Sequence, residues 1–563
     1  MRSIVLFAAL PIAISTVGCG STVPVEEPAS EEDLVLLHAI RPGTAPRSWD
    51  SAVSRPSSEA VAEQQRKACA FRRGAMPAAT LGSELPVGNG RLGDTSIPIQ
   101  NVIVLMQENR SFDSYFGHLA AWAKKNKKDA QGKPLSLDID APTEPLHVPE
   151  KISEPTGAKA QWLHAPELCF SDTNHEWAGS HLEWNGGKMD GFFEANDGFV
   201  EEGQPAVSTP YLSGQRAMSY YDERDIPFYY DLASTFAIGD RYFSSVIGPT
   251  WPNRDFMYAA SSYGVTTNKN PYCNKPGVGS SITCQQPEFF DRDTVIFDEL
   301  TRRSIPWKIF VDGALPAPRL GALLSPRQLG GRWGLSSISH ISTVNKLVDI
   351  LEGYSGEALP SVSFIDANVL ENAAGNDEHP PSDIQSGQDF VARITAALMR
   401  SPYWENTALF ITYDEHGGIY DHVAPPPACT PDPSNPYPDL ETDEDQEFAA
   451  EHPDLNTGFD RYGVRVPVIV VSPYAKRSFV SHKVYDHTSI LRFIETKYGL
   501  PALTNRDANA DPMLDMFDFN ANGGRGPWAS PPGLADPPFN GSWIDPNRLA
   551  TCKSLYPING NKF

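Results

Sequence analysis

The sequence has few basic residues and few charges of any kind. There are 46 Lys and Arg against 70 Asp and Glu, so the formal net charge is −24 at pH 7, and only 21% of the residues are charged. A chain this acidic is not expected to bind nucleic acid through a basic face, and its low charge content argues against a long solvated helical rod. An anionic substrate would be repelled at long range, so local cations would have to offset that field.

Several common motifs are also missing. The sequence contains no Walker loop, no dinucleotide-binding glycine fingerprint, no internal repeat and no apolar run long enough to span a bilayer. The cysteine spacings match no zinc signature, so no cysteine-metal site is expected. What is present is a chain of 563 residues with 40% hydrophobic content, 50 Pro and 43 Gly. This composition is sufficient for a large core with many ordered loops, and we expect one large domain with long excursions.

The N-terminus has the pattern of a processing segment. A short basic start is followed by an apolar stretch from Ile4 to Ile14 and by small residues that end in Cys19. Residues 1–19 resemble a bacterial lipoprotein signal, which implies export and a membrane anchor on the Cys19 thiol, facing the periplasm or the cell surface. The alternative is an ordinary secretory signal, in which Cys19 has no role. Residues 20–95 are expected to form a flexible tether and an N-terminal extension.

Cysteine usage fits an exported protein. Beyond Cys19 there are six cysteines, an even number that predicts disulfides: Cys69, Cys169, Cys273, Cys284, Cys429 and Cys552. Only the pair Cys273 and Cys284 can be suggested from spacing, as a clip on a Pro/Gly-rich loop. The rest of the pairing stays open.

Three runs without charge predict strands buried on both faces, and each ends at carboxylates. The run 99–106 leads to Glu108 and Asn109, the run 361–365 ends at Asp366, and the run 408–413 is followed by Asp414 and Glu415. In open α/β sheets the ligand crevice lies beyond the carboxyl ends of the strands, so these acids are expected to line a site. An equal alternative for Glu108 and Asn109 is a structural role at the start of a helix, with Glu108 as an acid near the helix N-terminus and Asn109 as the cap.

The order of elements predicts the fold class. Residues 386–400 form an amphipathic pattern typical of a helix, which joins two of the strands into a β-loop-α-β unit. A further core strand is expected at 466–471. Another helix is expected to begin after its N-cap Asp486 and to end at Gly499. We therefore expect an α/β fold, a three-layer α/β/α sandwich with a mostly parallel central sheet over residues 96–515. Residues 516–563 would form a Pro/Gly-rich tail packed on this domain.

Thr250 lies in a stretch that suits a nucleophile. It stands between Gly248-Pro249 and Trp251-Pro252-Asn253-Arg254, so a stiff turn would present its hydroxyl. The alternative is that Thr250 caps the following helix, with Pro252 in its first turn. Both can hold, because a helix N-terminus also stabilises a phosphate.

Histidines, an amide and a lysine gather in loop-like sequence. His175 and His181 precede Asn185 and Lys188, and His379 lies in a later loop. A lone histidine is more often structural, and we favour His175 over His181 as functional. Oxygen ligands, a hydroxyl and imidazoles together suit metal-assisted displacement at phosphorus. The cation lowers the pKa of the hydroxyl, and a histidine protonates the leaving oxygen.

Six stretches carry a resemblance to a known family. They are IQNVIVLMQENRSFDSYFG, WNGGKMDGFF, IGPTWPNR, NDEHPPSDIQSGQDF, ITYDEHGGIYDHVAPP and GVRVPVIVVSPYAK. In this order, from about Ile99 to about Leu500, they resemble the bacterial phosphoesterase family of secreted phospholipases C and acid phosphatases, a branch of the alkaline phosphatase superfamily. The resemblance implies an alkaline-phosphatase-like fold with long loop insertions.

The resemblance also implies roles for individual residues. The metal ligands would be Glu108, Asn109, Thr250, Asp414 and Glu415. Thr250 would be the nucleophile that becomes transiently phosphorylated, with His175 and His379 near the transferred group. Weaker candidates for substrate binding are Asn185, Lys188, Arg254, Asp366 and His422. One or more divalent ions are expected; oxygen-rich ligation suits Ca, Mg or Mn, and Zn occurs throughout the superfamily.

The motif around Thr250 also has the spacing of the sulfatase C-x-P-x-R motif. In sulfatases the Cys or Ser of that motif is oxidised to an aldehyde, and the extra methyl of threonine prevents this, so a sulfatase is disfavoured. We expect a metal-dependent phospholipase C acting on phospholipid, with a broad acid phosphatase acting on small phosphoesters as the alternative. A non-catalytic surface binding lipoprotein is the third hypothesis. The oligomeric state is left open.

Overall fold

The computed structural model describes residues 55–88, 96–200, 212–268, 295–312, 339–368, 375–432, 440, 443–455, 457–534 and 545–555. The expected signal segment with Cys19 lies outside the described residues. The suggested pair Cys273 and Cys284 lies outside them as well.

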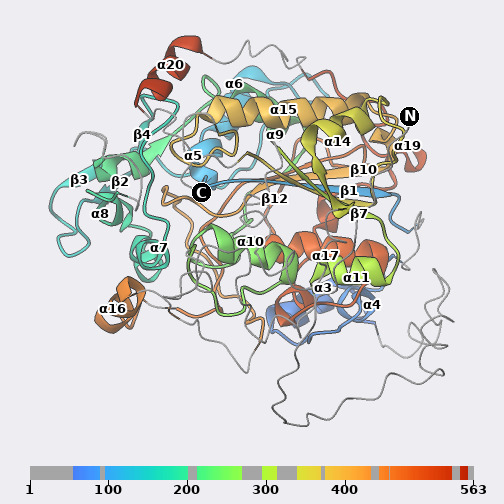
Figure 1. Cartoon of the computed structure of the whole chain (residues 1–563), viewed down its shortest axis with the longest axis horizontal. Helices are drawn as coiled ribbons and strands as arrows, with labels where there is room; N and C mark the ends of the chain where they lie inside the picture. The colour runs from blue at the N-terminus through green and yellow to red at the C-terminus, as the bar shows by residue number, and fades with distance from the viewer. Residues whose placement is uncertain are drawn as a thin grey trace, which may run out of the picture.

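An eight-stranded sheet forms the centre of the molecule (Figure 1). Its strands are β1 (Asn101–Gln107), β6 (Ala237–Gly239), β7 (Trp307–Val311), β8 (Ile341–Thr343), β9 (Val362–Asp366), β10 (Thr407–Tyr413), β11 (Val468–Val471) and β12 (Phe479–Ser481). Their order is β12-β6-β11-β10-β1-β9-β7-β8. Strand β11 runs antiparallel to both of its neighbours, and the other neighbouring pairs of this sheet are parallel. The predicted mostly parallel sheet is confirmed.

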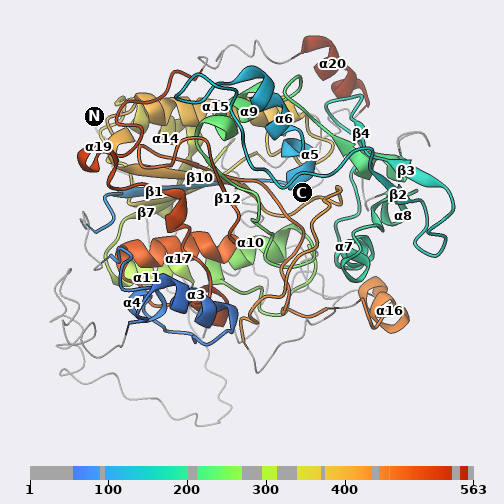
Figure 2. The ribbon, with the colours of Figure 1, turned by 180° about the vertical axis from the view of Figure 1, so that it is seen from behind.

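Helices cover both faces of this sheet. One face carries α5 (Phe112–Phe116), α6 (Leu119–Asn126), α9 (Pro227–Thr235), α14 (Val344–Leu351) and α15 (Ile384–Arg400). The other carries α10 (Thr250–Ala259), α11 (Ile296–Arg302) and α17 (His487–Tyr498), and the view from behind gives the same arrangement (Figure 2). The three-layer α/β/α sandwich is therefore confirmed.

The remaining described α-helices and β-strands lie around these layers. They are α3 (Glu59–Lys67), α4 (Pro77–Thr80), β2 (His147–Pro149), β3 (Lys159–Gln161), β4 (Leu163–His164), α7 (Trp177–Trp184), α8 (Phe192–Asn196), β5 (Ser219–Tyr220), α16 (Asp443–Glu451), α18 (Asn505–Ala508), α19 (Ala521–Gly524) and α20 (Pro546–Leu555). None of the helices in the described ranges combines the length and the apolar character needed to cross a membrane.

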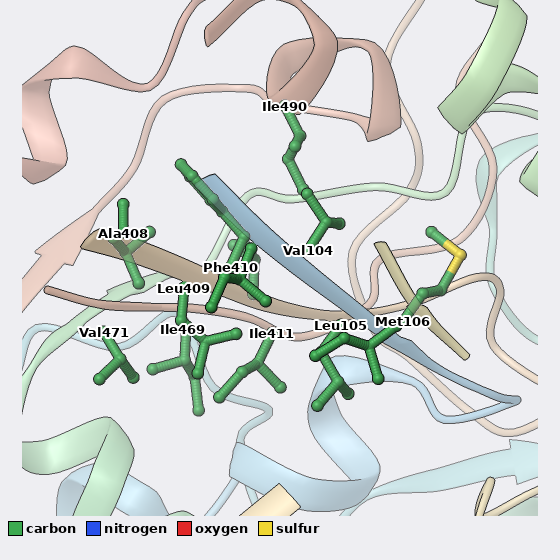
Figure 3. Close-up of a cluster of buried hydrophobic side chains, with 14 of the residues drawn as sticks. Val104, Leu105, Met106, Ala408, Leu409, Phe410, Ile411, Ile469, Val471 and Ile490 are labelled. Atoms are coloured by element: carbon green, nitrogen blue, oxygen red, sulfur yellow. The ribbon is translucent and has the colours of Figure 1, made fainter. Parts of the chain in front are cut away.

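The central strands form because their side chains are apolar on both faces. Every residue of β1 and β10 is buried. Figure 3 shows side chains of β1, β10 and β11 in one buried cluster together with Ile490 of α17. At about 1.5 to 3 kcal/mol for each large apolar side chain, such burial dominates the stability of the domain.

Local signals set the ends of two helices. The helix predicted at 386–400 begins at Ile384, because Asp383 is the N-cap and its side chain accepts a hydrogen bond from the Gln385 N–H. The predicted bounds of α17 are confirmed: Asp486 is its N-cap, and Gly499 ends it with a φ of 62°.

Among the described residues, two disulfides join the N-terminal extension and α20 to the domain. Cys69 pairs with Cys429 across 360 residues, and Cys169 pairs with Cys552 of α20 across 383 residues. Residues 55–88, expected within the tether and extension, include the helix α3, whose Arg66 is buried. This described part of the N-terminal extension is thus packed on the domain.

Candidate active site

The strand ends bring three carboxylates to one edge of the sheet. In the parallel register Gln107 pairs with Tyr413, and Met106 pairs with Asp366. Glu108 and Asp414 directly follow the paired residues, so they and Asp366 lie side by side. All three are buried. These acids therefore lie together at the carboxyl ends of the strands, where a ligand crevice is expected.

Arg254 of α10 faces all three of these acids. Its Nη2 lies 2.7 Å from Glu108 Oε1, its Nη1 lies 2.7 Å from Asp366 Oδ1, and its Nε lies 3.5 Å from Asp414 Oδ2. Burial by itself lowers the pKa of Arg254, but the three carboxylates raise it well above its ordinary value. One positive charge thus faces three negative charges, which leaves an excess of negative charge in a buried space.

Asn109 and Asp414 are held together by the backbone. The Asn109 N–H donates to Asp414 Oδ1 at 3.1 Å, and Asn109 has a φ of 61°. Gly417 permits this approach, because a Cβ there would lie 2.7 Å from Asn109. Burial and the charge of Glu108 raise the pKa of Asp414 to about 7.

Three side-chain oxygens in this cluster accept no hydrogen bond from the described residues. They are Asn109 Oδ1, Asp366 Oδ2 and Asp414 Oδ2, all buried. Buried oxygens without donors are rare in native proteins unless an ion or water satisfies them. Together with the excess negative charge, they fit a hard divalent cation.

His175 forms an ion pair with the second acid of the pair Asp414-Glu415. Its Nδ1 lies 2.9 Å from Glu415 Oε1, and its Nε2 lies 3.6 Å from Asp172 Oδ2. Burial by itself lowers the pKa of His175, but Glu415 and Asp172 raise it well above its ordinary value. Burial likewise raises the pKa of Glu415, and His175 outweighs this and brings it to about 2. A protonated imidazole is thus held beside the acids.

His379 lies beside His175, with ring centroids 5.4 Å apart. Its Nδ1–H donates to the Pro380 carbonyl at 2.5 Å, which turns Nε2 toward Asp172 Oδ2 at 3.8 Å. The ligand atoms of Asp172, His175 and His379 lie within 4.8 Å of one another, a spacing that could also hold a metal. The two predicted histidines are therefore brought together around one carboxylate.

Thr250 is the first residue of α10, and Pro249 is the N-cap. The alternative in which Thr250 caps the helix is thus wrong, because the helix already includes Thr250. Asn253 orders the preceding loop: its Oδ1 accepts the N–H groups of Ser245 and Val246, and its Nδ2 donates to the carbonyl of Pro249. Arg254 lies four residues after Thr250 on the same face of α10, so Thr250 is one helical turn from the residue that contacts the acids.

Two further buried histidines, His416 and His487, contact the pair Asp414-Glu415. His416 Nε2–H donates to Glu183 Oε2 at 2.6 Å, and its Nδ1 lies 3.3 Å from Glu415 Oε2. Burial by itself lowers the pKa of His416, but Glu183 raises it to about 9. His487 Nε2–H donates to the Asp414 carbonyl at 2.6 Å, and burial lowers its pKa to about 3.

The sequence analysis missed Asp172, Glu183 and His487. Asp172 precedes His175 by three residues in a polar loop, which is a weak signal. Nothing in the sequence pattern marks Glu183 or His487.

Three weaker candidates have other contacts. Asn185 ends α7 in a left-handed conformation, and its Nδ2 donates to Asp190 Oδ1 at 2.7 Å. Lys188 is exposed. His422 bonds Asp113 Oδ2 through Nδ1 at 2.6 Å, beside Arg465, which also pairs with Asp113. No contact among the described residues links these three side chains to the strand-end acids.

His181 provides a prediction about stability. It is buried, its Nδ1–H donates to the Trp177 carbonyl, and its Nε2 accepts from the Thr457 hydroxyl. Burial lowers its pKa from 6.5 to about 4. Stability from neutral His181 is therefore present above pH 6.5 and lost as the pH falls toward 4, by at most about 3 kcal/mol.

Thermal melts of wild type and His181→Gln check this. The wild-type advantage in Tm is expected to be larger at neutral pH than near the folded-state pKa of His181. A Tm difference between wild type and His181→Gln that does not change with pH would contradict the lowered pKa of His181.

Known proteins resemble the chain over most of its length. The sequence model of one family, described as "Phosphoesterase family", matches residues 99–501. Phospholipase C B of Mycobacterium tuberculosis is 30% identical over 482 residues, which cover 78% of this chain and 81% of that protein. Non-specific phospholipase C6 of Arabidopsis thaliana is 32% identical over 438 residues, which cover 74% of this chain and 72% of that protein.

One solved structure is also similar, a protein in the alkaline phosphatase superfamily from Vibrio parahaemolyticus. Its TM-score is 0.26 at 11% identity, and the match covers 50% of this chain and 63% of that chain. A TM-score this low is a slight structural similarity, so the fold is assigned from the strand order and strand directions of the central sheet.

Proposed function

We propose that this chain, which belongs to the phosphoesterase family, is a metal-dependent phospholipase C with a phosphothreonine intermediate. Its family membership and its relatives already make it a hydrolase acting on phosphoric ester bonds. The observation that carries the proposal is the meeting of Glu108, Asp366 and Asp414 around Arg254, one helical turn from Thr250. A hydroxyl, a cluster of buried acids and two imidazoles are the groups that displacement at phosphorus requires.

The proposed metal ligands are Glu108, Asn109, Asp414 and Glu415, together with the Thr250 hydroxyl. The donor-free oxygens of Asn109 and Asp414 support this set. When bound, a divalent cation lowers the pKa of the threonine hydroxyl and offsets the negative charge of the phosphoryl oxygens. Whether Asp172, His175 and His379 hold a second ion is left to measurement.

The reaction then proceeds in two steps carried by this chain's own residues. Thr250 Oγ1 releases its proton to solvent and attacks phosphorus, which forms an Oγ1–P bond and breaks the P–O bond to the leaving alcohol. A histidine, His175 or His379, gives a proton to the leaving oxygen. Water then attacks phosphorus and gives a proton back to that histidine, the Oγ1–P bond breaks, and Thr250 Oγ1 regains a proton from solvent. The N-terminus of α10 favours the negative charge that both steps concentrate near Thr250.

A zwitterionic phospholipid is the proposed substrate. The relatives named phospholipase C support a lipid substrate for this chain. The net charge of −24 disfavours docking on an anionic membrane, whereas a zwitterionic head group is tolerated. We also propose that the protein is exported and anchored through Cys19, which would place residues 96–515 at a membrane surface.

The test compares two chromogenic esters. Protein lacking residues 1–19 is assayed on p-nitrophenylphosphorylcholine and on p-nitrophenyl phosphate, before and after chelation. Chelator-sensitive release mainly from the choline diester is expected. Release mainly from the monoester would replace the phospholipase with the acid phosphatase, and release from neither ester by metal-loaded protein would favour a binding lipoprotein.

A further inference from the structure

Glu378 is a fully buried carboxylate in the loop that carries His379. Four side chains donate hydrogen bonds to it, from β1, β10, α5 and α9: Gln107 at 3.2 Å, Tyr413 at 2.8 Å, Tyr115 at 2.6 Å and Tyr229 at 2.5 Å. Two of these bonds reach Oε1 and two reach Oε2. A buried carboxylate with this many donors holds a rigid network in place, because breaking one bond leaves a polar group unpaired.

The backbone around Glu378 is tied to the end of β1. The Glu108 N–H donates to the Asp377 carbonyl at 2.8 Å, and Arg110 Nη2 donates to the Glu378 carbonyl at 2.5 Å. Glu378 itself has a φ of 74°, in the left-handed region. A residue other than glycine pays about 1 to 2 kcal/mol there, so this conformation persists because the surrounding contacts impose it.

Each of three members of this network adjoins a residue of the proposed reaction. Gln107 precedes Glu108, Tyr413 precedes Asp414, and Glu378 precedes His379. The helices α5 and α9, which supply two of the tyrosines, lie on one face of the sheet, and α10 with Thr250 lies on the other (Figure 1).

A glycine makes room for this carboxylate. Gly387 of α15 faces it, and a Cβ at that position would lie 2.1 Å from Glu378 Cγ and 2.5 Å from its Oε1. Because a helix interior disfavours glycine by about 1 kcal/mol, the close approach of Glu378 gives a reason for its presence.

We infer that Glu378 is a positioning residue for the reaction, which fixes His379 relative to the strand ends that carry Glu108 and Asp414. The inference rests on the proposed function. Glu378 has no role in bond making: it acts through His379, by holding the loop that presents this imidazole.

The test is a double-mutant cycle between Glu378 and His379 on p-nitrophenylphosphorylcholine. Glu378→Gln keeps the shape but offers an amide N–H to groups that are already donors. It is expected to lower kcat by about 10- to 100-fold with little change in KM, the usual effect of disturbing a supporting residue. In the His379→Ala background the same change is expected to lower kcat by less than about twofold, since the residue it positions is gone.

Glu495→Gln is the matched control. Glu495 is equally buried and pairs with Arg492 at 2.7 Å within α17. This control is expected to lower Tm without lowering kcat. Should Glu378→Gln fail to fold, Tyr229→Phe removes a single donor and is expected to lower kcat by about fivefold, again only when His379 is present.

Equal losses of kcat in both backgrounds, or an unchanged kcat in folded Glu378→Gln, would overturn the inference. Failure of the proposed function would look different. In that case folded wild type would hydrolyse neither ester, and the inference would fall with the function. Full kcat in His379→Ala would overturn the inference alone, because His175 would remain as the proton donor of the proposed function.

Discussion

Thr250→Ala is expected to lower kcat/KM by roughly 10⁴-fold or more while the protein stays folded. The change removes the proposed nucleophile and leaves the acids, Arg254 and both histidines in place. Thr250 is the first residue of α10 and Pro249 is its N-cap, so the threonine hydroxyl is not the cap of that helix and little stability is expected to depend on it. The loss should therefore appear in the chemical step and be small in Tm. The measurements are p-nitrophenol release and a thermal melt.

Two variants separate the hydroxyl from its surroundings. Thr250→Ser keeps the hydroxyl and loses one methyl, and it is expected to retain activity within about tenfold of wild type. Thr395→Ala removes another buried hydroxyl, on α15. It is expected to change Tm and leave kcat/KM intact. Substantial turnover by Thr250→Ala would contradict the assignment.

Asp414→Asn is expected to lower kcat/KM on the order of 10³-fold, and chelation of wild type is expected to have a similar effect. Asparagine preserves the shape of the side chain but removes a negative charge from the cluster around Arg254. A cation present at about 1,000 times its Kd stabilises the folded state by about 4 kcal/mol, so the wild-type Tm should rise with metal concentration. In Asp414→Asn this rise should be small.

Glu495→Gln is the matched control for metal binding. Glu495 is also buried and also pairs with a buried arginine, Arg492, at 2.7 Å, within α17. This variant should melt earlier than wild type but keep the rise of Tm with metal. A full metal response in Asp414→Asn would exclude Asp414 as a ligand.

The same assay has an expected pH dependence. In the metal-free protein burial and Glu108 raise the pKa of Asp414 to about 7, so the carboxyl group is protonated below that pH. Metal must displace this proton, and metal affinity should therefore fall as the pH drops below about 7.

The sheet and its acidic edge could be predicted because each depends on a local pattern. The strands ending near Glu108, Asp366 and Asp414 are apolar on both faces, and a parallel sheet brings their carboxyl ends to one edge. Asp486 and Gly499 likewise bound α17 through capping preferences that act within a few residues.

The contacts between distant segments could not be predicted in this way. Arg254 joins Glu108, 146 residues away, and Asp366, 112 residues away, and no spacing rule predicts such a pairing. The disulfide of Cys69 with Cys429 spans 360 residues, and no spacing rule predicts that pairing either. Asn185 had a usable signal, because an asparagine before two glycines is typical of a left-handed helix end.

The most direct measurement is to trap the covalent intermediate. Metal-loaded protein is mixed with p-nitrophenylphosphorylcholine, quenched in acid during turnover, digested and analysed by mass spectrometry. The proposed mechanism predicts a phosphorylcholine adduct on the peptide that contains Thr250, absent from Thr250→Ala. Steady turnover with no adduct on that peptide, or with an adduct on another residue, would contradict it.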